Sequence, residues 1–335
     1  MTEQELLTVR DLSLVFQTEQ GLVHALDEVS LDISEGEVVG LVGESGAGKS
    51  VLGLSIIGLI PVPPGKIESG SIIYQGQDLT KFSRKEMVKI RGTGISMIFQ
   101  EPMTSLNPVF KVGNQIEESI QLRKKRMNNL NPNEKPGEST MNEVIQALKL
   151  VRIPDPENVL GRYPHELSGG MRQRVMIAMA LAAKPSLLIA DEPTTALDVT
   201  TQARILALMR ELIKKVKTSI LFISHDFGVI AQIADRVAVM YAGNIVEVAL
   251  TKNILKEPLH PYTKGLLQCL PSISKGEAAL EPLPGTIPNL INPPSGCKFH
   301  PRCPYAMPIC AKQKPGFMLP QPTRRVACFL FGGEA

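Results

Sequence analysis

Tryptophan is absent from this chain of 335 residues, and other aromatic residues are few, with 10 Phe and 5 Tyr. Charge of one sign is also lacking, because 36 Lys and Arg stand against 33 Asp and Glu, which leaves a net charge of +3. This balance gives no sign of binding to nucleic acid or to an anionic membrane surface. The one basic run, Arg123 to Arg126, is short, and we interpret it as a solvated helix end.

Long apolar runs are missing as well. No segment approaches the roughly 20 apolar residues that a membrane-spanning helix needs. The acidic start, Met1 to Glu5, lacks the charged-then-apolar layout of a signal peptide. We therefore expect a soluble, intracellular chain that can dock on a membrane protein. Internal repeats and coiled-coil heptads are not found either.

Cysteine is scarce, with five residues in the chain, and four of them crowd into the last 40 residues. In a reducing compartment such clustering favours a metal over disulfides. The four are separated by 5, 6 and 17 residues, which is not the C-x₂-C pairing of a zinc ribbon. Four thiolates suit either Zn²⁺ or an iron–sulfur cluster, and four buried thiols are the plain alternative. These residues are Cys297, Cys303, Cys310 and Cys328, with His300 as an alternate ligand, whereas Cys269 is expected in the core.

The chain is organised around residues 43–50, GESGAGKS, which fit the phosphate-binding pattern GxxxxGK[ST]. An apolar run at 38–42 predicts a strand before this loop, and residues 51–60 predict a helix after it. Glycines at 43, 46 and 48 let successive N–H groups point at a polyphosphate. Lys49 should reach the β- and γ-phosphates, and the Ser50 hydroxyl should bind Mg²⁺. The loop residues predicted to contact nucleotide are Gly43, Glu44, Ser45, Gly46, Ala47, Gly48, Lys49, Ser50 and Val51. We predict that the chain binds a nucleoside triphosphate.

Two further hydrophobic strands end in polar residues. The strand at 187–191 ends at Asp191, which we predict to be the second Mg²⁺ anchor, and Glu192 follows as a general base for water. The strand at 219–224 leads to His225, for which a structural hydrogen bond and a functional role both remain open. Because the carboxyl ends of parallel strands meet at one edge of a sheet, these residues point to a ligand there.

The remaining periodicities indicate how the chain is divided. Residues 6–42 alternate as strands of a small antiparallel sheet, in which Phe16 reads as a core residue. Residues 111–183 are mainly helical, with a loop around 128–137, and so suggest a helical subdomain. Proline recurs through residues 271–322, which predicts an appended module that is rich in loops.

Taken together, these motifs resemble the nucleotide-binding subunit of an ATP-binding cassette (ABC) transporter. LSGGMRQR at 167–174 matches the signature sequence of that family, between Gln100 of a Gln loop and the Asp191-Glu192 strand end. A D-loop at 196–198 and a switch histidine, His225, follow in the order of the family. The resemblance implies an α/β fold, a P-loop NTPase cassette with a RecA-like core, an antiparallel β subdomain and an α-helical subdomain. It places the cassette at 1–270, its helical subdomain at about 101–183, and a Cys/Pro-rich extension at 271–335.

Other segments resemble the oligopeptide/dipeptide importer branch. They are IFQEPMTSLNP at 98–108, YPHELSGGMRQRVMIAMAL at 163–181, HPYT at 260–263, and the tail from LPG at 283 through CKFHPRCPYAMPIC. This resemblance implies an ATPase that powers uptake of short peptides, with sugars or nickel as related solutes. It implies a peripheral position on the cytoplasmic face of the membrane, and a [4Fe–4S] cluster at the four clustered cysteines, with Zn²⁺ as the alternative. The implied partners are a second, related cassette, two membrane permease subunits and an extracellular solute-binding protein.

The family also assigns roles to single residues. The resemblance implies that Phe16 stacks on adenine, a role we prefer over core packing. ATP would lie between the P-loop of one cassette and the Ser168-Gly169-Gly170 turn of the other, with Asp198 nearby. Gln100 would sense the metal and the attacking water, and His225 would hold the γ-phosphate. The Gln100 region and the helical insert would contact the permease subunits.

Two other classes of function compete with the importer. A soluble ABC ATPase could act on DNA, on ribosomes or in iron–sulfur assembly, but the long coiled coil of chromosome-type members is absent, and only one cassette is present. A regulatory protein could instead use the cysteine tail to sense iron or redox state. That protein would change its nucleotide turnover when the cluster is lost.

Overall fold

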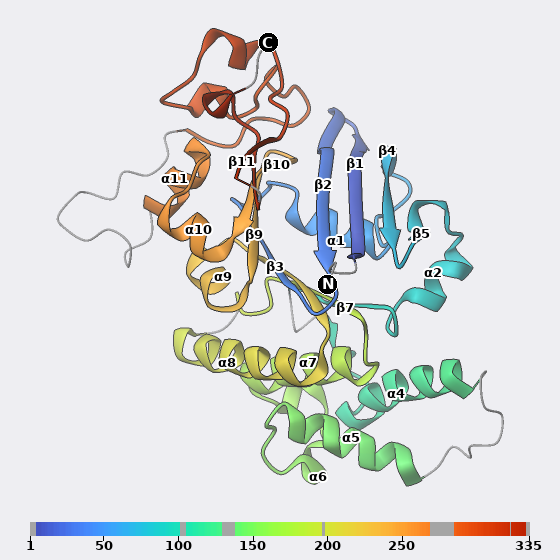
Figure 1. Cartoon of the computed structure of the whole chain (residues 1–335). Helices are drawn as coiled ribbons and strands as arrows, with labels where there is room; N and C mark the ends of the chain where they lie inside the picture. Colours follow the sequence, from blue (N-terminus) through green and yellow to red (C-terminus); the bar gives the residue numbers. More distant parts are fainter. Residues whose placement is uncertain are drawn as a thin grey trace. The chain divides into compact units, whose positions relative to one another are not determined.

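The computed structural model describes residues 5–100, 105–128, 138–195, 198–268, 285–321 and 323–332. The chain divides into two compact units (Figure 1). The P-loop unit comprises Met1–Ser34, Val38–Lys81 and Phe222–Ala335, and the helical unit comprises Glu35–Glu37 and Phe82–Leu221. The units are defined by compactness, and no boundary between them lies at residue 270. The domain boundary predicted there stays a prediction.

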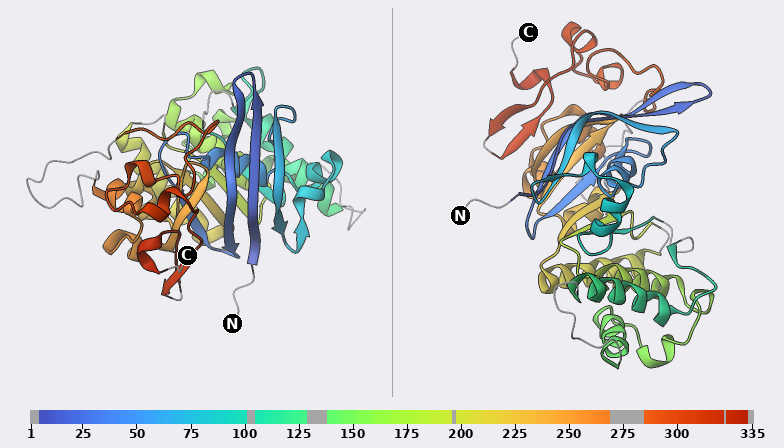
Figure 2. Two further views of the ribbon diagram at one scale, coloured as in Figure 1. Left: turned by 90° about the horizontal axis from the view of Figure 1, so that it is seen from above. Right: turned by 90° about the vertical axis from the view of Figure 1, so that its right-hand side faces the viewer.

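An antiparallel sheet begins the P-loop unit, as the alternation of its sequence predicts. Its strands are β1 (Glu5–Thr18), β2 (Gly21–Ser34), β4 (Gly65–Tyr74) and β5 (Gln77–Asp78), in the order β2-β1-β4-β5. Figures 1 and 2 show the long β1–β2 hairpin in blue beside β4. Leu7, Leu12 and Leu14 of β1 are fully buried, so one face of the hairpin supplies core.

A second sheet in this unit has the order β11-β12-β10-β9-β3. Its strands are β3 (Val38–Val42), β9 (Arg236–Tyr241), β10 (Asn244–Leu250), β11 (Met318–Gln321) and β12 (Arg324–Val326). β3 runs parallel to β9, with Val42 opposite Val239, and the other pairs are antiparallel. All five residues of β3 are buried, as expected for a parallel strand covered on both faces. The C-terminal β12 extends this sheet at the edge of β10, with Val326 opposite Glu247.

Short helices complete the P-loop unit. They are α1 (Lys49–Ile56), α9 (Phe227–Ile233), α10 (Thr251–Lys256) and α11 (Pro261–Gln268), with 3₁₀ turns at Leu79–Lys81, His300–Arg302, Pro308–Ala311 and Phe329–Phe331. α1 ends at Ile56, earlier than the predicted end at residue 60, because Leu59 is already exposed and a Pro-rich turn follows. Among the described residues after 285, the helical segments are short 3₁₀ turns, as the recurrent prolines predict.

Helices dominate the other unit. They are α2 (Arg84–Ile90), α4 (Val112–Asn128), α5 (Glu138–Leu150), α6 (Pro156–Val159), α7 (Gly169–Ala182) and α8 (Val199–Val216), with a 3₁₀ turn at Pro164–Glu166. Figure 1 shows α4 and α5 in green, and both helices contact α7. Ile116, Val144 and Val175 are fully buried where α4, α5 and α7 pack together. This packing agrees with the predicted helical insert.

Two parallel strands belong to the helical unit as well. They are β6 (Ile95–Ile98) and β7 (Leu187–Asp191), paired with Ile95 opposite Leu187 and Ile98 opposite Ala190. β8 (Ser219–Ser224), whose six residues are all buried, contains the boundary between the units. The predicted loop at 128–137 lies, apart from Asn128, outside the described residues, as does Cys269.

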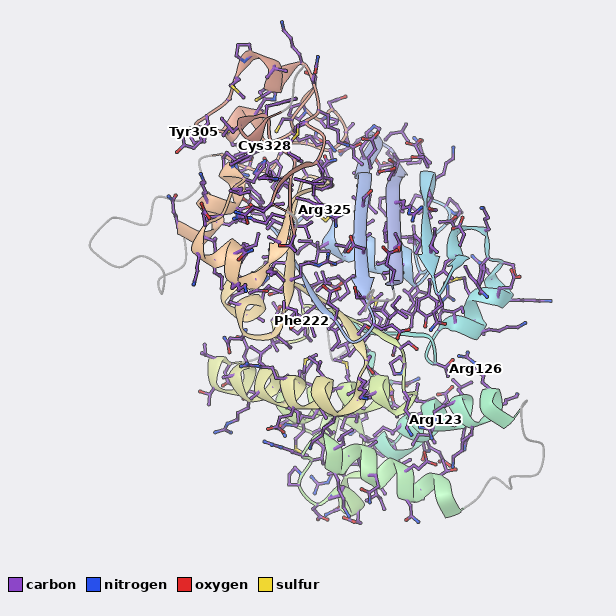
Figure 3. The ribbon with its side chains drawn as sticks, in the orientation of Figure 1. Arg123, Arg126, Phe222, Tyr305, Arg325 and Cys328 are labelled. Carbon is purple, nitrogen blue, oxygen red and sulfur yellow. The ribbon has the colours of Figure 1, made fainter. Side chains whose placement is uncertain are left out.

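The basic run in α4 corrects one prediction (Figure 3). Arg123 donates a hydrogen bond to the Ala182 carbonyl at the end of α7 and pairs with Glu143 of α5. Arg126 donates to the Arg91 carbonyl over 2.8 Å and also to the Val88 carbonyl and the Thr93 hydroxyl. The run does lie near a helix end, but these guanidinium groups satisfy carbonyls at other helix ends, so it is not simply solvated.

Candidate nucleotide-binding site

The loop after β3 has the conformation that its glycines permit. A Cβ atom on Gly43 would lie 2.1 Å from the Met240 carbonyl oxygen, so no other residue fits there. Gly46 and Gly48 have φ angles of +81° and +102°, in the region that favours glycine. Gly48 is the N-cap of α1 and makes no side-chain hydrogen bond to the helix, and the positive end of a helix attracts an anion.

Lys49 lies inside this loop. Its ammonium donates hydrogen bonds to the carbonyl oxygens of Gly43, over 2.8 Å, and Glu44, over 2.9 Å. Only 5% of Lys49 is exposed, while Ser45 and Gly46 at the tip of the loop are exposed. The loop therefore holds a cation beneath an exposed, glycine-containing turn at the start of a helix, which fits a polyphosphate.

Glu44 makes contacts that the sequence analysis missed. Its N–H donates to the Tyr262 hydroxyl over 2.9 Å, and Arg302 reaches both oxygens of its carboxylate. Tyr262 lies in the HPYT segment and Arg302 in the cysteine-containing segment, and the sequence predicted no role for either residue. Neither contact has a signal in the sequence, because these residues lie more than 200 positions from Glu44.

Phe16 and His225 also belong to the P-loop unit. Phe16 lies near the end of β1, where it is half-buried and opposite Val23 of β2 and Gly65 of β4. Phe16 is therefore partly accessible to a ligand. His225 follows β8 and is exposed, and the next residue, Asp226, caps α9 by accepting the Gly228 N–H over 2.7 Å.

In the helical unit, Asp191 and Glu192 lie where β7 ends, as predicted. Asp191 is buried, and the Glu192 backbone has a φ of +45°, a left-handed conformation that costs a non-glycine residue energy. The Glu192 carboxylate accepts hydrogen bonds from the Gln100 amide, over 3.1 Å, and from the Thr195 hydroxyl, over 2.9 Å. The structure thus brings together Gln100 and Glu192, two predicted catalytic residues that are 92 positions apart.

The signature sequence forms the start of α7. Ser168 is the N-cap, and its hydroxyl accepts the Met171 N–H over 3.4 Å. Ser168 and Gly169 are exposed, so the positive end of this helix is open to a ligand. Asp198 caps α8 in the same way, by accepting the Thr201 N–H. This backbone hydrogen bond, together with one from the Thr201 side chain, lowers the pKa of the Asp198 carboxyl. Ala196 and Leu197 of the predicted D-loop lie outside the described residues.

The four clustered cysteines all occur as free thiols. Burial raises the pKa of Cys297 to about 11, a shift to which the neighbouring thiols of Cys310, Cys328 and Cys303 also contribute. Burial likewise raises the pKa of Cys303 and Cys328. Within the part of the chain that the structure describes, no group of three or more His, Cys, Asp or Glu side chains is arranged to hold a metal ion. The geometry therefore does not support the predicted cluster, although the four donors occupy one small module.

A glycine-rich loop joins a buried strand to a helix, and Lys49 lies inside this loop. Another strand of the chain ends in acidic residues. These features define a P-loop nucleotide-binding protein. Comparison with known families narrows this class. The pattern described as ABC transporter matches residues 26–195, and the pattern described as oligopeptide/dipeptide transporter, C-terminal region, matches residues 246–310. The chain belongs to the ABC transporter family.

Relatives with assigned names span nearly the whole chain. The oligopeptide transport ATP-binding protein OppD of Bacillus subtilis is 50% identical over 331 residues, which cover 98% of this chain and 90% of OppD. The dipeptide transport ATP-binding protein DppD of the same organism is 48% identical over 327 residues, with coverage of 98% and 95%. Among solved structures, the dimeric cassette MJ0796 bound to ADP and Pi has a TM-score of 0.62 at 26% identity, covering 73% of this chain and 98% of that one.

No helix in the described ranges is both long enough and apolar enough to cross a membrane.

Proposed function

We propose that this chain is the ATP-hydrolysing subunit of an ABC importer for oligopeptides or dipeptides. The observation that carries the proposal is the pair of family matches in one chain, a cassette at 26–195 and a peptide-transporter C-terminal region at 246–310. Sugars and nickel are the related solutes that the same type of ATPase would serve. Solute selectivity would reside in other chains of the importer.

The local geometry supports the roles predicted for single residues. Glu192 would activate the attacking water, and its hydrogen bond with Gln100 would keep the two side chains together before nucleotide binds. Lys49 and the N–H groups of residues 43–51 would bind the phosphates, and Phe16 would stack on the base. Ser168, Gly169, Gly170 and Asp198 would face the nucleotide of a partner cassette, and His225 would hold the γ-phosphate.

Magnesium would be held by Ser50, Asp191 and Gln100. These residues fit a hard cation because a hydroxyl, a carboxylate and a side-chain amide all offer oxygen donors. A bound Mg²⁺ would neutralise charge on the phosphates. The chain's own residues would orient the nucleotide and exclude competing water.

The described part of the C-terminal extension, residues 285–332, is called the cysteine module from here on. It would hold a [4Fe–4S] cluster, with Zn²⁺ as the alternative. Four free thiols in a small module suit either group chemically, but they would have to lose protons and come together to bind it. The test is anaerobic purification followed by iron, sulfide and zinc analysis. Absorbance near 400 nm with iron and sulfide would support the cluster. Zinc without sulfide would overturn it.

The partners proposed for this subunit are a related second cassette, two permease chains and an extracellular solute-binding protein, which place it peripherally on the cytoplasmic face of the membrane. Purification of the tagged protein in mild detergent from native membranes tests this assembly. We expect permease chains and a second cassette to co-purify, and peptides to be found on the binding protein. Recovery with soluble partners only would overturn the importer and favour a soluble ABC ATPase.

A further inference from the structure

An arginine of the cysteine module contacts the phosphate-binding loop directly. Arg302 Nη1 lies 3.1 Å from Glu44 Oε2, and Arg302 Nη2 lies 3.2 Å from Glu44 Oε1. The pair is bidentate, with side-chain exposures of 8% for Arg302 and 28% for Glu44. The guanidinium, which is always charged in proteins, also donates a hydrogen bond to the Tyr241 hydroxyl over 3.4 Å. The contact is therefore a fixed ionic one, and most water is excluded from the arginine.

The position of Arg302 is set by the cysteine module. It ends the 3₁₀ turn His300–Arg302 and immediately precedes Cys303. The residue before this turn, Phe299, is buried, and its ring packs against Tyr241 and Tyr262 at centroid distances of 5.2 and 5.5 Å. The guanidinium itself lies 5.7 Å from the centroid of the Tyr241 ring. A change in the fold of this segment would therefore move Arg302.

Glu44 in turn connects Arg302 to the lysine of the loop. The Glu44 N–H donates to Tyr262, its side chain accepts from Arg302, and its carbonyl accepts from Lys49 over 2.9 Å. One residue thus carries the contact with the module on its side chain and the contact with the phosphate-binding lysine on its backbone. Release of the side chain would free the backbone segment on which Lys49 rests.

Other contacts fasten the module to the strands of the same unit without reaching the loop. Lys298 pairs with Asp27 over 2.9 Å, and Arg325 pairs with Asp32 over 2.5 Å. A cavity of about 200 Å³ is lined in part by Tyr241 and Cys297, so the module is not tightly packed around these two residues. Arg302 thus connects the module to the loop, whereas the pair of Arg325 with Asp32 is a matched contact away from the loop. Figure 3 labels Arg325 and Cys328 in this region.

We propose that Arg302 is a positioning residue for the phosphate-binding loop, through which the cysteine module sets the affinity of the site for nucleotide. This inference rests on the proposed binding of ATP by the loop. The bidentate contact holds Glu44, and hence the carbonyl that accepts Lys49, in the arrangement that receives a phosphate. When Arg302 is lost or displaced, the loop must be ordered by the nucleotide itself, and affinity falls.

The test compares the full-length wild type with Arg302→Gln, Arg302→Lys, Glu44→Gln, the Arg302→Gln/Glu44→Gln double variant and the control Arg325→Gln. Equilibrium titration with a fluorescent ATP analogue gives Kd, steady-state hydrolysis gives KM and kcat, and thermal unfolding gives Tm. We expect Arg302→Gln to raise Kd and KM about tenfold, a typical coupling between sites, with kcat much less affected. Arg302→Lys should recover part of the loss, because it restores the charge but not the bidentate geometry.

The double variant separates positioning from general stability. If Arg302 acts through Glu44, the double variant binds no more weakly than the weaker single variant. Arg325→Gln should lower Tm as Arg302→Gln does and leave Kd unchanged. Unchanged Kd in Arg302→Gln, or additive losses in the double variant, would overturn the inference. A wild type that binds ATP but recovers no permease would overturn the importer alone and leave this inference standing.

Discussion

The side-chain amide of Gln100 donates a hydrogen bond to the Glu192 carboxylate over 3.1 Å, and Glu192 has a left-handed backbone with φ of +45°. This backbone conformation costs a non-glycine residue energy. Thr195 supplies the second hydrogen bond to the same oxygen, over 2.9 Å. The carboxylate that we propose as the general base is thus held by two donors just after a buried strand.

Glu192→Gln should abolish hydrolysis and spare nucleotide binding. The amide keeps the size of the side chain but cannot accept a proton, so kcat should fall by about 10²–10⁴-fold. ATPase assays and nucleotide titration measure the two effects. Thr195→Ala, which removes one hydrogen bond and leaves the carboxylate, should lower kcat only a few-fold. Turnover of Glu192→Gln within tenfold of the wild type would show that another group is the base.

Gly43 and Gly46 should respond differently to alanine. At Gly43 the new Cβ would lie 2.1 Å from the Met240 carbonyl, so strand β9 or the loop must move, at a cost of about 3 kcal/mol. At Gly46 no atom lies within 4 Å of a Cβ, and the φ of +81° alone costs about 1–2 kcal/mol. Thermal unfolding of the two variants gives the comparison. Equal destabilisation would contradict the close approach at Gly43.

His260 should make stability dependent on pH. Burial lowers the pKa of His260 to about 3, and its Nδ1 accepts the Tyr262 N–H over 3.0 Å, so the ring is neutral in the folded protein. The unfolded chain binds a proton near pH 6.5, and the folded chain does not. The contribution of His260 to the free energy of unfolding is therefore fully present above pH 6.5. It decreases as the pH falls toward 3, by up to about 1.4 kcal/mol per pH unit.

Urea denaturation between pH 7.5 and 4.5 measures this slope. His260→Asn keeps an acceptor for the Tyr262 N–H and removes the titration, so its stability should change less with pH. Carboxylates contribute equally to the wild type and to His260→Asn, so the difference between the two slopes reports on His260. Although burial raises the pKa of Asp27, its contacts with Lys298 and Lys314 lower it overall, below 3.8, so its contribution is lost only at more acidic pH. An unchanged slope in His260→Asn would rule out His260 as the source.

Glu247 and Arg324 form a buried ion pair, so replacing Glu247 alone should cost more stability than replacing both partners. Both side chains are at most 2% exposed, and Glu247 also accepts the N–H groups of Leu259 and His260. Glu247→Leu leaves a buried guanidinium and two amides without this acceptor, at a cost of about 3–5 kcal/mol. Adding Arg324→Leu should recover part of this loss. As a control, Arg152→Ala removes an exposed partner of Glu211 and should cost at most about 1 kcal/mol.

The cysteine thiols should react slowly in metal-free protein. Burial raises the pKa of Cys297 to about 11, two units above the ordinary value of 9.0, so its thiolate fraction falls about 100-fold. Alkylation at pH 8, followed by mass spectrometry of the peptides, gives the rate at each cysteine, and denatured protein gives the reference. Labelling of Cys297 at the rate of the denatured chain would contradict its burial.

Local sequence was enough to predict the parts whose chemistry is local. The glycines, Lys49 and the flanking strand and helix predicted the P-loop, because backbone conformation at glycine and hydrophobic periodicity are properties of short segments. Ser168 and Asp198, which the resemblance to the family singled out, cap the helices that follow them. The resemblance in the signature sequence predicted the family, which the comparisons confirm.

Tertiary structure alone decided the contacts between distant segments. Gln100 meets Glu192, Arg302 meets Glu44, and Arg126 caps the end of α2, over separations of 92, 258 and 35 positions. Sequence periodicity carries no information about such pairs, since each segment obeys its own local pattern whichever partner it meets. The four cysteines show the same limit: their residue type and clustering were evident, but their arrangement depends on how the loops between them fold. The sequence by itself therefore determined which chemistry is present, and the packing of the chain decided which groups act together.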